Sequence, residues 1–143
     1  MIITTARKPS SKTRIFCKHL ARFIGGEYIT RGKTSFSELA DEPFLLSVGE
    51  YKGNPGSFSF FLNGKPALSI RANVSLDKEI DTGVEPIIDG DSPLAIAFSQ
   101  ASGIKIGGTS ERVIRIGDRI EFLERGIPYI ILTVLGTRGE GIV

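Results

Sequence analysis

The sequence predicts an α/β protein that forms one domain. Residues 11–24 and 94–101 show helical spacing, with cap signals before them and glycines after them, and short β-branched and aromatic runs flank both stretches. The 143 residues fit a single domain, and a hydrophobic share of 41% is typical of a folded protein. We therefore expect one compact unit in which helices pack on strands.

The first half of the chain alternates short strands with helices. Pro9 ends the apolar run at the amino terminus, and Ser10 or Ser11 then caps a helix that Gly25-Gly26 stops. Ser35 begins a Ser-x-x-Glu capping box, which predicts a second, short helix. The expected elements are a strand at 1–5, a helix from 10 or 11 to about 24, a strand at 28–29 and a short helix at 35–41.

Strand material follows, with turn signals between the runs. Strands are expected at 44–48, 58–62 and 67–76, and a turn rich in glycine separates the first two. Asn63-Gly64 is a strong hairpin signal because both residues tolerate positive φ. The sequence therefore predicts a hairpin that joins 58–62 to 67–74.

An acidic connector divides the chain. Residues 77–91 hold six acids and one lysine, a net charge of −5, which is typical of a solvated linker; the segment could also turn away acidic partners or fold against a basic one. Beyond it, Ser92-Pro93 begins a helix that Gly103 ends. Strands are expected at 105–106, 112–116, 120–123 and 129–135. Two halves, about 1–76 and 77–143, each with a helix among strands, suggest an internal duplication.

Positive charge is concentrated near the amino terminus. Residues 1–37 carry eight cations against one acid, Glu27, a local balance of +7 in a chain whose formal net charge is +2. The cations are Arg7, Lys8, Lys12, Arg14, Lys18, Arg22, Arg31 and Lys33. The arginines of the second half, Arg112 among them, are interspersed with acids and indicate an ordinary mixed surface.

The charge on the first helix is one-sided. A step of about 100° per residue places Phe16, Leu20, Phe23 and Ile24 on one stripe and Arg14, Lys18 and Arg22 nearly opposite. A plain solvated face would mix both signs, whereas this one has no acid, so the pattern favours nucleic-acid binding. The candidate RNA-binding residues are Arg7, Lys8, Ser10, Lys12, Arg14, Lys18, Arg22, Arg31, Gly32 and Lys33.

Nothing in the sequence requires catalysis, a cofactor or a metal. Cys17 is the sole cysteine and His19 the sole histidine, and side chains two apart on a helix point away from each other. Gly32-Lys33-Thr34 resembles the tail of a P-loop, but Glu27 occupies the position that needs glycine. No run approaches the ~20 apolar residues of a membrane span and no secretion signal is evident, so we expect a cytoplasmic protein.

Two short elements resemble a known family. Thr5–Arg14, TARKPSSKTR, is followed by Tyr28–Lys33, YITRGK, and by Leu39. Together they resemble the opening of the Brix domain, in particular of the short archaeal Brix proteins of ribosome biogenesis. Gly53-Asn54-Pro55 is similar to the hairpin that follows in that family, and the likeness is densest over residues 3–56.

The resemblance implies an α/β fold of two related halves, each a small mixed sheet with helices similar to the anticodon-binding domain of class II tRNA synthetases. It also implies a non-catalytic factor that binds precursor rRNA and assists its processing, with other assembly factors or ribosomal proteins as further partners. Separately from the resemblance, we expect a monomer. Carried over residue by residue, the basic motif positions are Arg7, Lys8, Lys12, Arg14, Arg31 and Lys33. The sequence departs from the family pattern at Ala6, where serine is expected, and at Lys12, where arginine is commoner; lysine keeps the charge without the bidentate fork.

Two other interpretations of the basic segment stay open. It could dock an acidic partner as a protein-interaction module, or Gly32-Lys33-Thr34 could belong to a nucleotide-dependent enzyme. The acid at Glu27 weighs against the second, because a phosphate cradle excludes a carboxylate.

Overall fold

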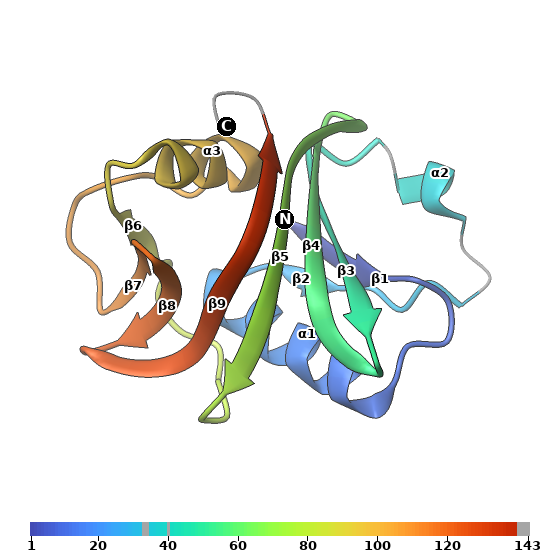
Figure 1. The fold of residues 1–143 in the computed structure, drawn as a ribbon, viewed down its shortest axis with the longest axis horizontal. Helices are drawn as coiled ribbons and strands as arrows, with labels where there is room; N and C mark the ends of the chain where they lie inside the picture. Colours follow the sequence, from blue (N-terminus) through green and yellow to red (C-terminus); the bar gives the residue numbers. More distant parts are fainter. Residues whose placement is uncertain (33–34, 40, 140–143) are drawn as a thin grey trace.

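Helices and strands follow one another along the chain much as the sequence predicts (Figure 1). The structure, a computed structural model, describes residues 1–32, 35–39 and 41–139. The elements are β1 (Ile2–Thr5), α1 (Ser11–Ile24), β2 (Glu27–Tyr28), α2 (Phe36–Leu39), β3 (Phe44–Tyr51), β4 (Asn54–Leu62), β5 (Lys65–Leu76), β6 (Ile87–Asp89), α3 (Pro93–Ser102), β7 (Arg112–Ile116), β8 (Arg119–Glu124) and β9 (Ile127–Gly139). The α/β class is confirmed, as are the caps at Ser10 and Ser92, whose side chains accept from the backbone N–H of Thr13 and Ala95.

The strands of the described residues form one nine-stranded sheet in the order β2-β1-β3-β4-β5-β9-β8-β7-β6. β1 runs parallel to β2 and β3, and β6 runs parallel to β7, while the remaining neighbours are antiparallel. The expectation of a small sheet in each half is therefore corrected. The long strands β5 and β9 pair in the middle, from Leu68↔Gly139 to Leu76↔Ile130, and so join both halves into one sheet.

Three hairpins of the sheet close through the same kind of turn. Asn63 and Gly64 have φ of 51° and 80°, and Lys52-Gly53 and Arg125-Gly126 also have positive φ at both positions. Such turns match the right-handed twist of the strands that they join. The hairpin predicted at Asn63-Gly64 is confirmed, whereas β4 begins at Asn54 rather than at Phe58, because Lys52-Gly53 alone makes the preceding turn.

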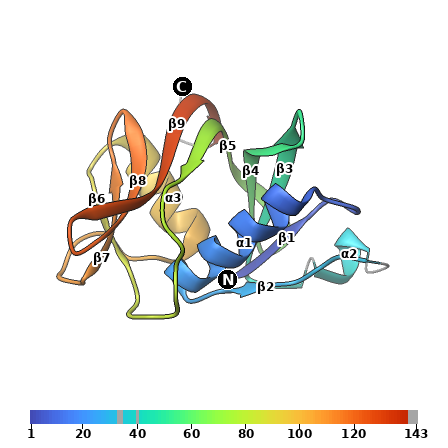
Figure 2. The same ribbon diagram turned by 90° about the horizontal axis from the view of Figure 1, so that it is seen from below.

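One hydrophobic core holds α1 and α3 against one face of the sheet (Figure 2). Phe58 and Phe60, on the same face of β4, contact Phe16 of α1 and Phe98 of α3 with ring centroids 5.8 and 5.2 Å apart. Phe23 of α1 in turn contacts Phe122 of β8 at 5.3 Å. Helix α1 thus packs on strands of both halves and α3 packs on β4 of the first half, so a single core spans the two halves.

A buried arginine ties the two halves together at the end of α1. Arg112, the first residue of β7, is 2% exposed, and its guanidinium lies 5.1 Å from the ring centre of Phe23. Its Nε donates to Glu124 at 2.8 Å, its Nη1 to the carbonyl oxygens of Arg22 and Phe23, and its Nη2 to the carbonyl oxygen of Asp81 at 2.6 Å. The prediction of an ordinary surface arginine is wrong here, because Arg112 shares the inward face of β7 with Ile114 and Ile116.

Replacing Arg112 should destabilise the fold strongly. Arg112→Met leaves three carbonyl oxygens, those of Arg22, Phe23 and Asp81, and the carboxylate of Glu124 without this donor. We expect the free energy of unfolding to fall by about 3 kcal/mol or more. Urea denaturation measures the difference. The matched control is Arg115→Met on the same strand, whose exposed pair with Asp89 spans 3.8 Å and should be worth no more than about 0.5 kcal/mol. Equal losses in the two variants would contradict the role assigned to Arg112.

Stability should also depend on pH through Glu124. The hydrogen bond from Arg112 is the main cause that lowers the pKa of the Glu124 carboxyl from its ordinary value of 4.5. A carboxyl with a lowered pKa stabilises the folded state above its ordinary pKa, and this contribution is lost as the pH falls through the lowered pKa. The difference in unfolding free energy between the wild type and Glu124→Gln should therefore be largest near neutral pH and shrink in acid. Urea titrations between neutral and acidic pH test this, and a difference that does not change with pH would refute it.

Candidate nucleic-acid interface

Helix α1 presents its cations on a single exposed ridge. Ser10 caps its first turn, and Gly25, with φ of 72°, ends it. Phe16, Leu20 and Phe23 are buried, as the helical spacing predicted. Arg14, Lys18 and Arg22 are exposed and span eight residues, or roughly 12 Å along the helix.

The loops that follow the parallel strands bring further candidate residues to one end of the sheet. Arg7 and Lys8 leave β1, and Arg31 and Gly32 follow β2. Because β1 and β2 are parallel, with Ile3 opposite Tyr28, the segments that follow them leave the sheet at the same end. The guanidinium of Arg31 lies 5.7 Å from the ring centre of Phe36. Lys33 lies outside the described residues.

The candidate residues do not all lie together. Arg7, Lys8, Lys12 and Arg14 are near the start of α1, at the carboxyl ends of β1 and β2. Lys18 and Arg22 lie further along the helix, toward the end where the backbone N–H of Glu27 donates to the carbonyl oxygen of Met1. The candidate residues therefore extend along the length of α1 and do not form one compact pocket.

Ser10 has a structural role. Its hydroxyl donates to the carbonyl oxygen of Gly53 at 2.7 Å and accepts from the backbone N–H of Thr13, while its own N–H donates to Glu50 at 2.6 Å. These bonds fasten the start of α1 to the β3–β4 hairpin. We therefore expect Ser10 to support the fold and not to contact RNA.

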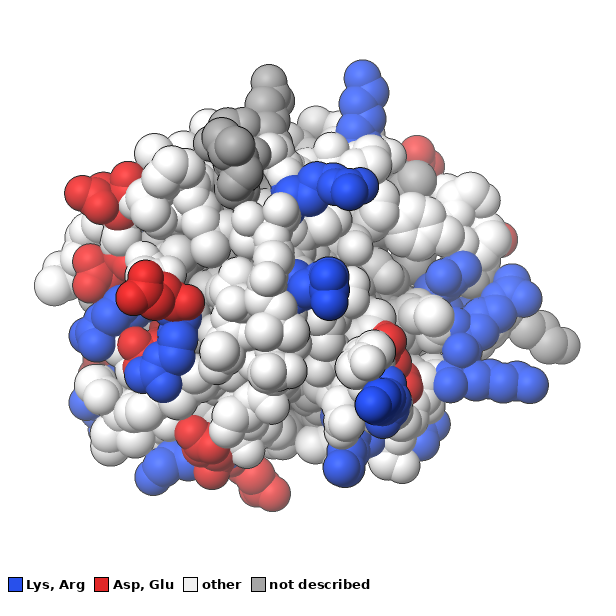
Figure 3. All heavy atoms as spheres, in the orientation of Figure 1, with Lys and Arg blue, Asp and Glu red and all other residues white. Residues whose placement is uncertain are grey.

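Six of the cations near the amino terminus form no ion pair with an acid in the described residues. The ion pairs found in the described part of the chain are Arg112–Glu124, Arg115–Asp89, Arg119–Glu121 and Arg125–Glu111, all of them beyond β5. Arg7, Lys8, Lys12, Arg14, Lys18 and Arg22 take part in none of them. Figure 3 shows the contrast on one face, with acids and bases interleaved over β7 and β8 and mostly basic side chains beside the loop that follows β1.

The acidic connector is anchored on α1 and is not a free linker. Ile80 is 1% exposed, and its backbone N–H donates to Nδ1 of His19 at 2.9 Å. Arg22 reaches the carbonyl oxygen of the same residue at 3.4 Å, and Arg112 holds that of Asp81. The prediction of a solvated linker is corrected for this stretch, since an apolar side chain and three backbone groups fix it in place. No carboxylate of the described connector forms an ion pair with the helix.

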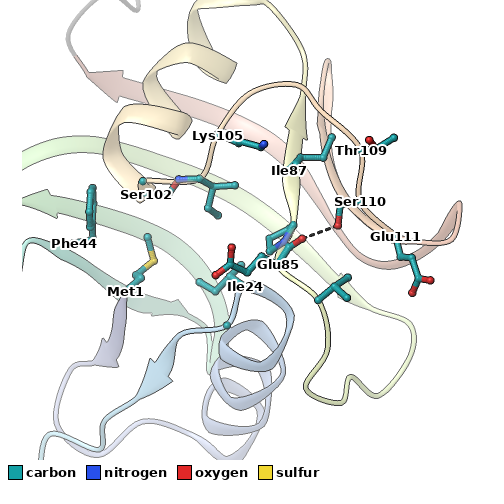
Figure 4. A pocket seen from close by; sticks show the side chains of 15 residues that line it. Met1, Ile24, Phe44, Glu85, Ile87, Ser102, Lys105, Thr109, Ser110 and Glu111 are labelled. Carbon is teal, nitrogen blue, oxygen red and sulfur yellow. Dashed lines mark hydrogen bonds between the residues drawn. The ribbon is translucent and has the colours of Figure 1, made fainter.

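A hollow beside the connector shows no catalytic arrangement among its described lining residues (Figure 4). Its volume is about 750 Å³, and it lies between the end of α1, the connector and the end of α3. The hydroxyl of Ser110 donates to the backbone carbonyl of Glu85 at 2.6 Å, so it is held by the chain and not by a general base. Within the described ranges, no three His, Cys, Asp or Glu side chains gather as metal ligands. Gly32 is described, but Lys33 and Thr34, the rest of the P-loop-like segment, lie outside these ranges.

Comparisons with known proteins identify the family of this basic α/β protein. It is 42% identical over 106 residues to a "Probable Brix domain-containing ribosomal biogenesis protein" of Methanosarcina barkeri, covering 68% of each chain. It is 38% identical to the protein of the same name from Methanosarcina mazei, over 88% of this chain and 91% of that one. The chain belongs to the Brix-domain family of ribosomal biogenesis proteins, as the resemblance predicted.

Solved structures agree with this assignment. The crystal structure of Mil (Mth680), an archaeal Imp4-like protein, matches with a TM-score of 0.81 at 27% identity, over 97% of this chain and 99% of that one. A ribosomal biogenesis protein from Aeropyrum pernix matches with a TM-score of 0.73 at 26% identity, over 93% of each chain. No family model matched the sequence. None of the helices in the described ranges has the length and hydrophobicity to cross a lipid bilayer.

Cys17 should be chemically inert in the folded protein. Its side chain is buried, and burial, with a smaller contribution from Glu50, raises the pKa of the thiol to about 12. Because the thiolate is the reactive form, we expect almost no alkylation by iodoacetamide at pH 8 until the protein is unfolded in urea. Mass spectrometry of the labelled protein measures this, and rapid labelling of the native protein would contradict the buried position.

Proposed function

We propose that this protein is a non-catalytic factor that binds precursor rRNA during ribosome assembly, using the ridge of α1 and the loops beside it. The observation that carries the proposal is the absence of internal ion pairs for Arg7, Lys8, Lys12, Arg14, Lys18 and Arg22 in the described structure. The names of its relatives supply the ribosomal setting.

Electrostatics favours a polyanion over a neutral ligand. Unpaired cations at intervals of about 6 Å along a helix repel one another unless an external anion neutralises them, and RNA phosphates do this while releasing counterions. The residues proposed to contact phosphate are Arg7, Lys8, Lys12, Arg14, Lys18, Arg22, Arg31 and Lys33, with Gly32 allowing close backbone approach. Arginine can hold a phosphate by two bonds, which lysine cannot.

The relation between the two halves is a second part of the proposal. In residues 1–76, β1 leads into α1 and is parallel to β2 and β3; in 77–143, β6 leads into α3, is parallel to β7 and has a parallel bridge from Ile88 to Ile106. These matching orders support descent from one duplicated α/β unit. Likeness of each half to the anticodon-binding domain of class II tRNA synthetases, a monomeric state and a cytoplasmic location stay predictions.

Removing three cations should weaken RNA binding without unfolding the protein. We choose Arg7→Gln, Arg14→Gln and Lys18→Gln together, and leave Lys8 unchanged because its φ of 56° disfavours most replacements. Affinity for a structured rRNA fragment should fall about tenfold or more, and the slope of log affinity against log salt should decrease by about 2 from an initial value of roughly 3 to 5. Fluorescence anisotropy at several salt concentrations gives both quantities.

The control removes the same charge from the second half. The control variant combines Arg115→Gln, Arg119→Gln and Arg125→Gln. These arginines take part in exposed ion pairs, so their replacement should change the affinity for RNA less than twofold. Equal losses in both triple variants would refute a localised interface. A melting temperature lowered only in the first triple variant would mean that its cations are structural.

The alternative is a protein-interaction module that docks an acidic partner on the same ridge. Purification of the protein with its bound partners, before and after nuclease treatment, separates the two. Partners that survive nuclease treatment and are lost in the first triple variant would favour the alternative.

A further inference from the structure

A groove opens where two neighbouring strands of the sheet diverge. β4 pairs with β5 only between Ser57↔Arg71 and Leu62↔Lys65, whereas β5 continues beside β9 as far as Leu76. Register shifts at Gly49/Glu50 and at Arg71/Ala72 bend the strands at this point. The β3–β4 hairpin and the end of β5 therefore separate, with α1 behind them (Figure 1), around a hollow of about 1080 Å³.

Exposed apolar side chains are concentrated in this groove. Ile15 of α1, Tyr51 of the hairpin and Leu135 of β9 line it and are 51%, 71% and 58% exposed. They come from three separate elements, so no single amphipathic segment explains their exposure. Apolar groups gathered in a groove and left open to water indicate a ligand.

The groove also carries positive charge and hydrogen-bonding groups. Lys12 lies on its helix wall and Arg71 on its strand wall, and neither takes part in an ion pair found in the described ranges. Lys52 sits 5.4 Å from the ring centre of Tyr51. Glu50, the acid among the lining residues, already accepts from the backbone N–H of Ser10. The amides of Asn54 and Asn73 add donors and acceptors suited to the edges of bases.

We propose that this groove binds a single-stranded segment of RNA, with an unpaired base stacked on Tyr51 and phosphates held by Lys12 and Arg71. The proposal rests on the function proposed above and specifies which form of RNA is recognised. An exposed aromatic ring combined with cations and amides is the usual means of holding single strands, because only an unpaired base offers its face for stacking. Lys12 belongs both to the groove and to α1, so a strand that leaves the ridge can enter the groove without a break in positive charge.

The test compares Tyr51→Ser with Tyr51→Phe on two RNA probes. Fluorescence anisotropy uses a labelled twelve-nucleotide oligouridine and a twelve-base-pair RNA duplex. Tyr51→Ser should weaken oligouridine binding about tenfold, Tyr51→Phe less than twofold, and neither should change duplex binding. Arg71→Gln should weaken oligouridine binding, with Arg115→Gln as the control that leaves it unchanged. Ultraviolet crosslinking to oligouridine should attach the RNA to the peptide that contains Tyr51 in the wild type.

The possible results distinguish failure of the groove from failure of the proposed function. Unchanged oligouridine affinity in Tyr51→Ser, together with a loss in the triple variant of the ridge, would overturn the groove and leave the proposed function standing. A wild type that binds neither probe nor a structured rRNA fragment would overturn both. Loss of a protein partner in Tyr51→Ser, with RNA binding intact, would assign the groove to a polypeptide and refute the proposal. Tyr51 is so exposed that these variants should keep the wild-type melting temperature.

Discussion

The guanidinium of Arg112 fixes the position of α1 relative to the second half of the chain. It donates to carbonyl oxygens at the end of α1, which lack partners within the helix, and to one in the connector. A positive charge beside the carboxyl end of a helix also interacts favourably with the helix dipole. Gly83 leaves room for the side chain, since a Cβ there would lie 2.7 Å from Nη2 of Arg112. The hydrogen bonds of one buried cation therefore hold α1 against the connector and β7.

Surface charges are paired differently in the two halves of the described structure. In the second half, arginines meet acids across neighbouring strands, as Arg112 meets Glu124 and Arg115 faces Glu121 in the register of β7 and β8. In the first half, the cations Arg7, Lys8, Lys12, Arg14, Lys18 and Arg22 take part in none of the ion pairs found in the described residues. The connector is fixed to α1 through its backbone and through Ile80, while its carboxylates are exposed and form no ion pair with the helix. The ion pairs of the described structure therefore lie in the second half, and the cations of α1 are left without one.

The sequence predicted what depends on local chemistry. The limits of α1 follow from Ser10 and Gly25, its buried stripe from the spacing of Phe16, Leu20 and Phe23, and the β4–β5 hairpin from Asn63-Gly64. The pairing of β5 with β9 could not be predicted in this way, because the connector, α3 and three strands separate them in the sequence. The burial of Arg112 had one local signal, its place two residues before Ile114 on an alternating strand, but its partners at residues 22, 23 and 81 are distant in sequence. The groove at Tyr51 had no local signal, since its walls meet only in the folded sheet.

The ridge and the groove would contribute to binding by different physics, which makes their contributions separable. Contacts to phosphate gain much of their free energy from released counterions and weaken steeply as salt is added. Stacking of a base on Tyr51 buries apolar surface and depends little on ionic strength. A protein with both would bind rRNA broadly at low salt through the ridge, and at high salt would retain mainly those segments whose unpaired bases reach the groove. Selectivity for unpaired RNA should therefore rise with salt while affinity falls, and this combination distinguishes two cooperating surfaces from a single electrostatic patch.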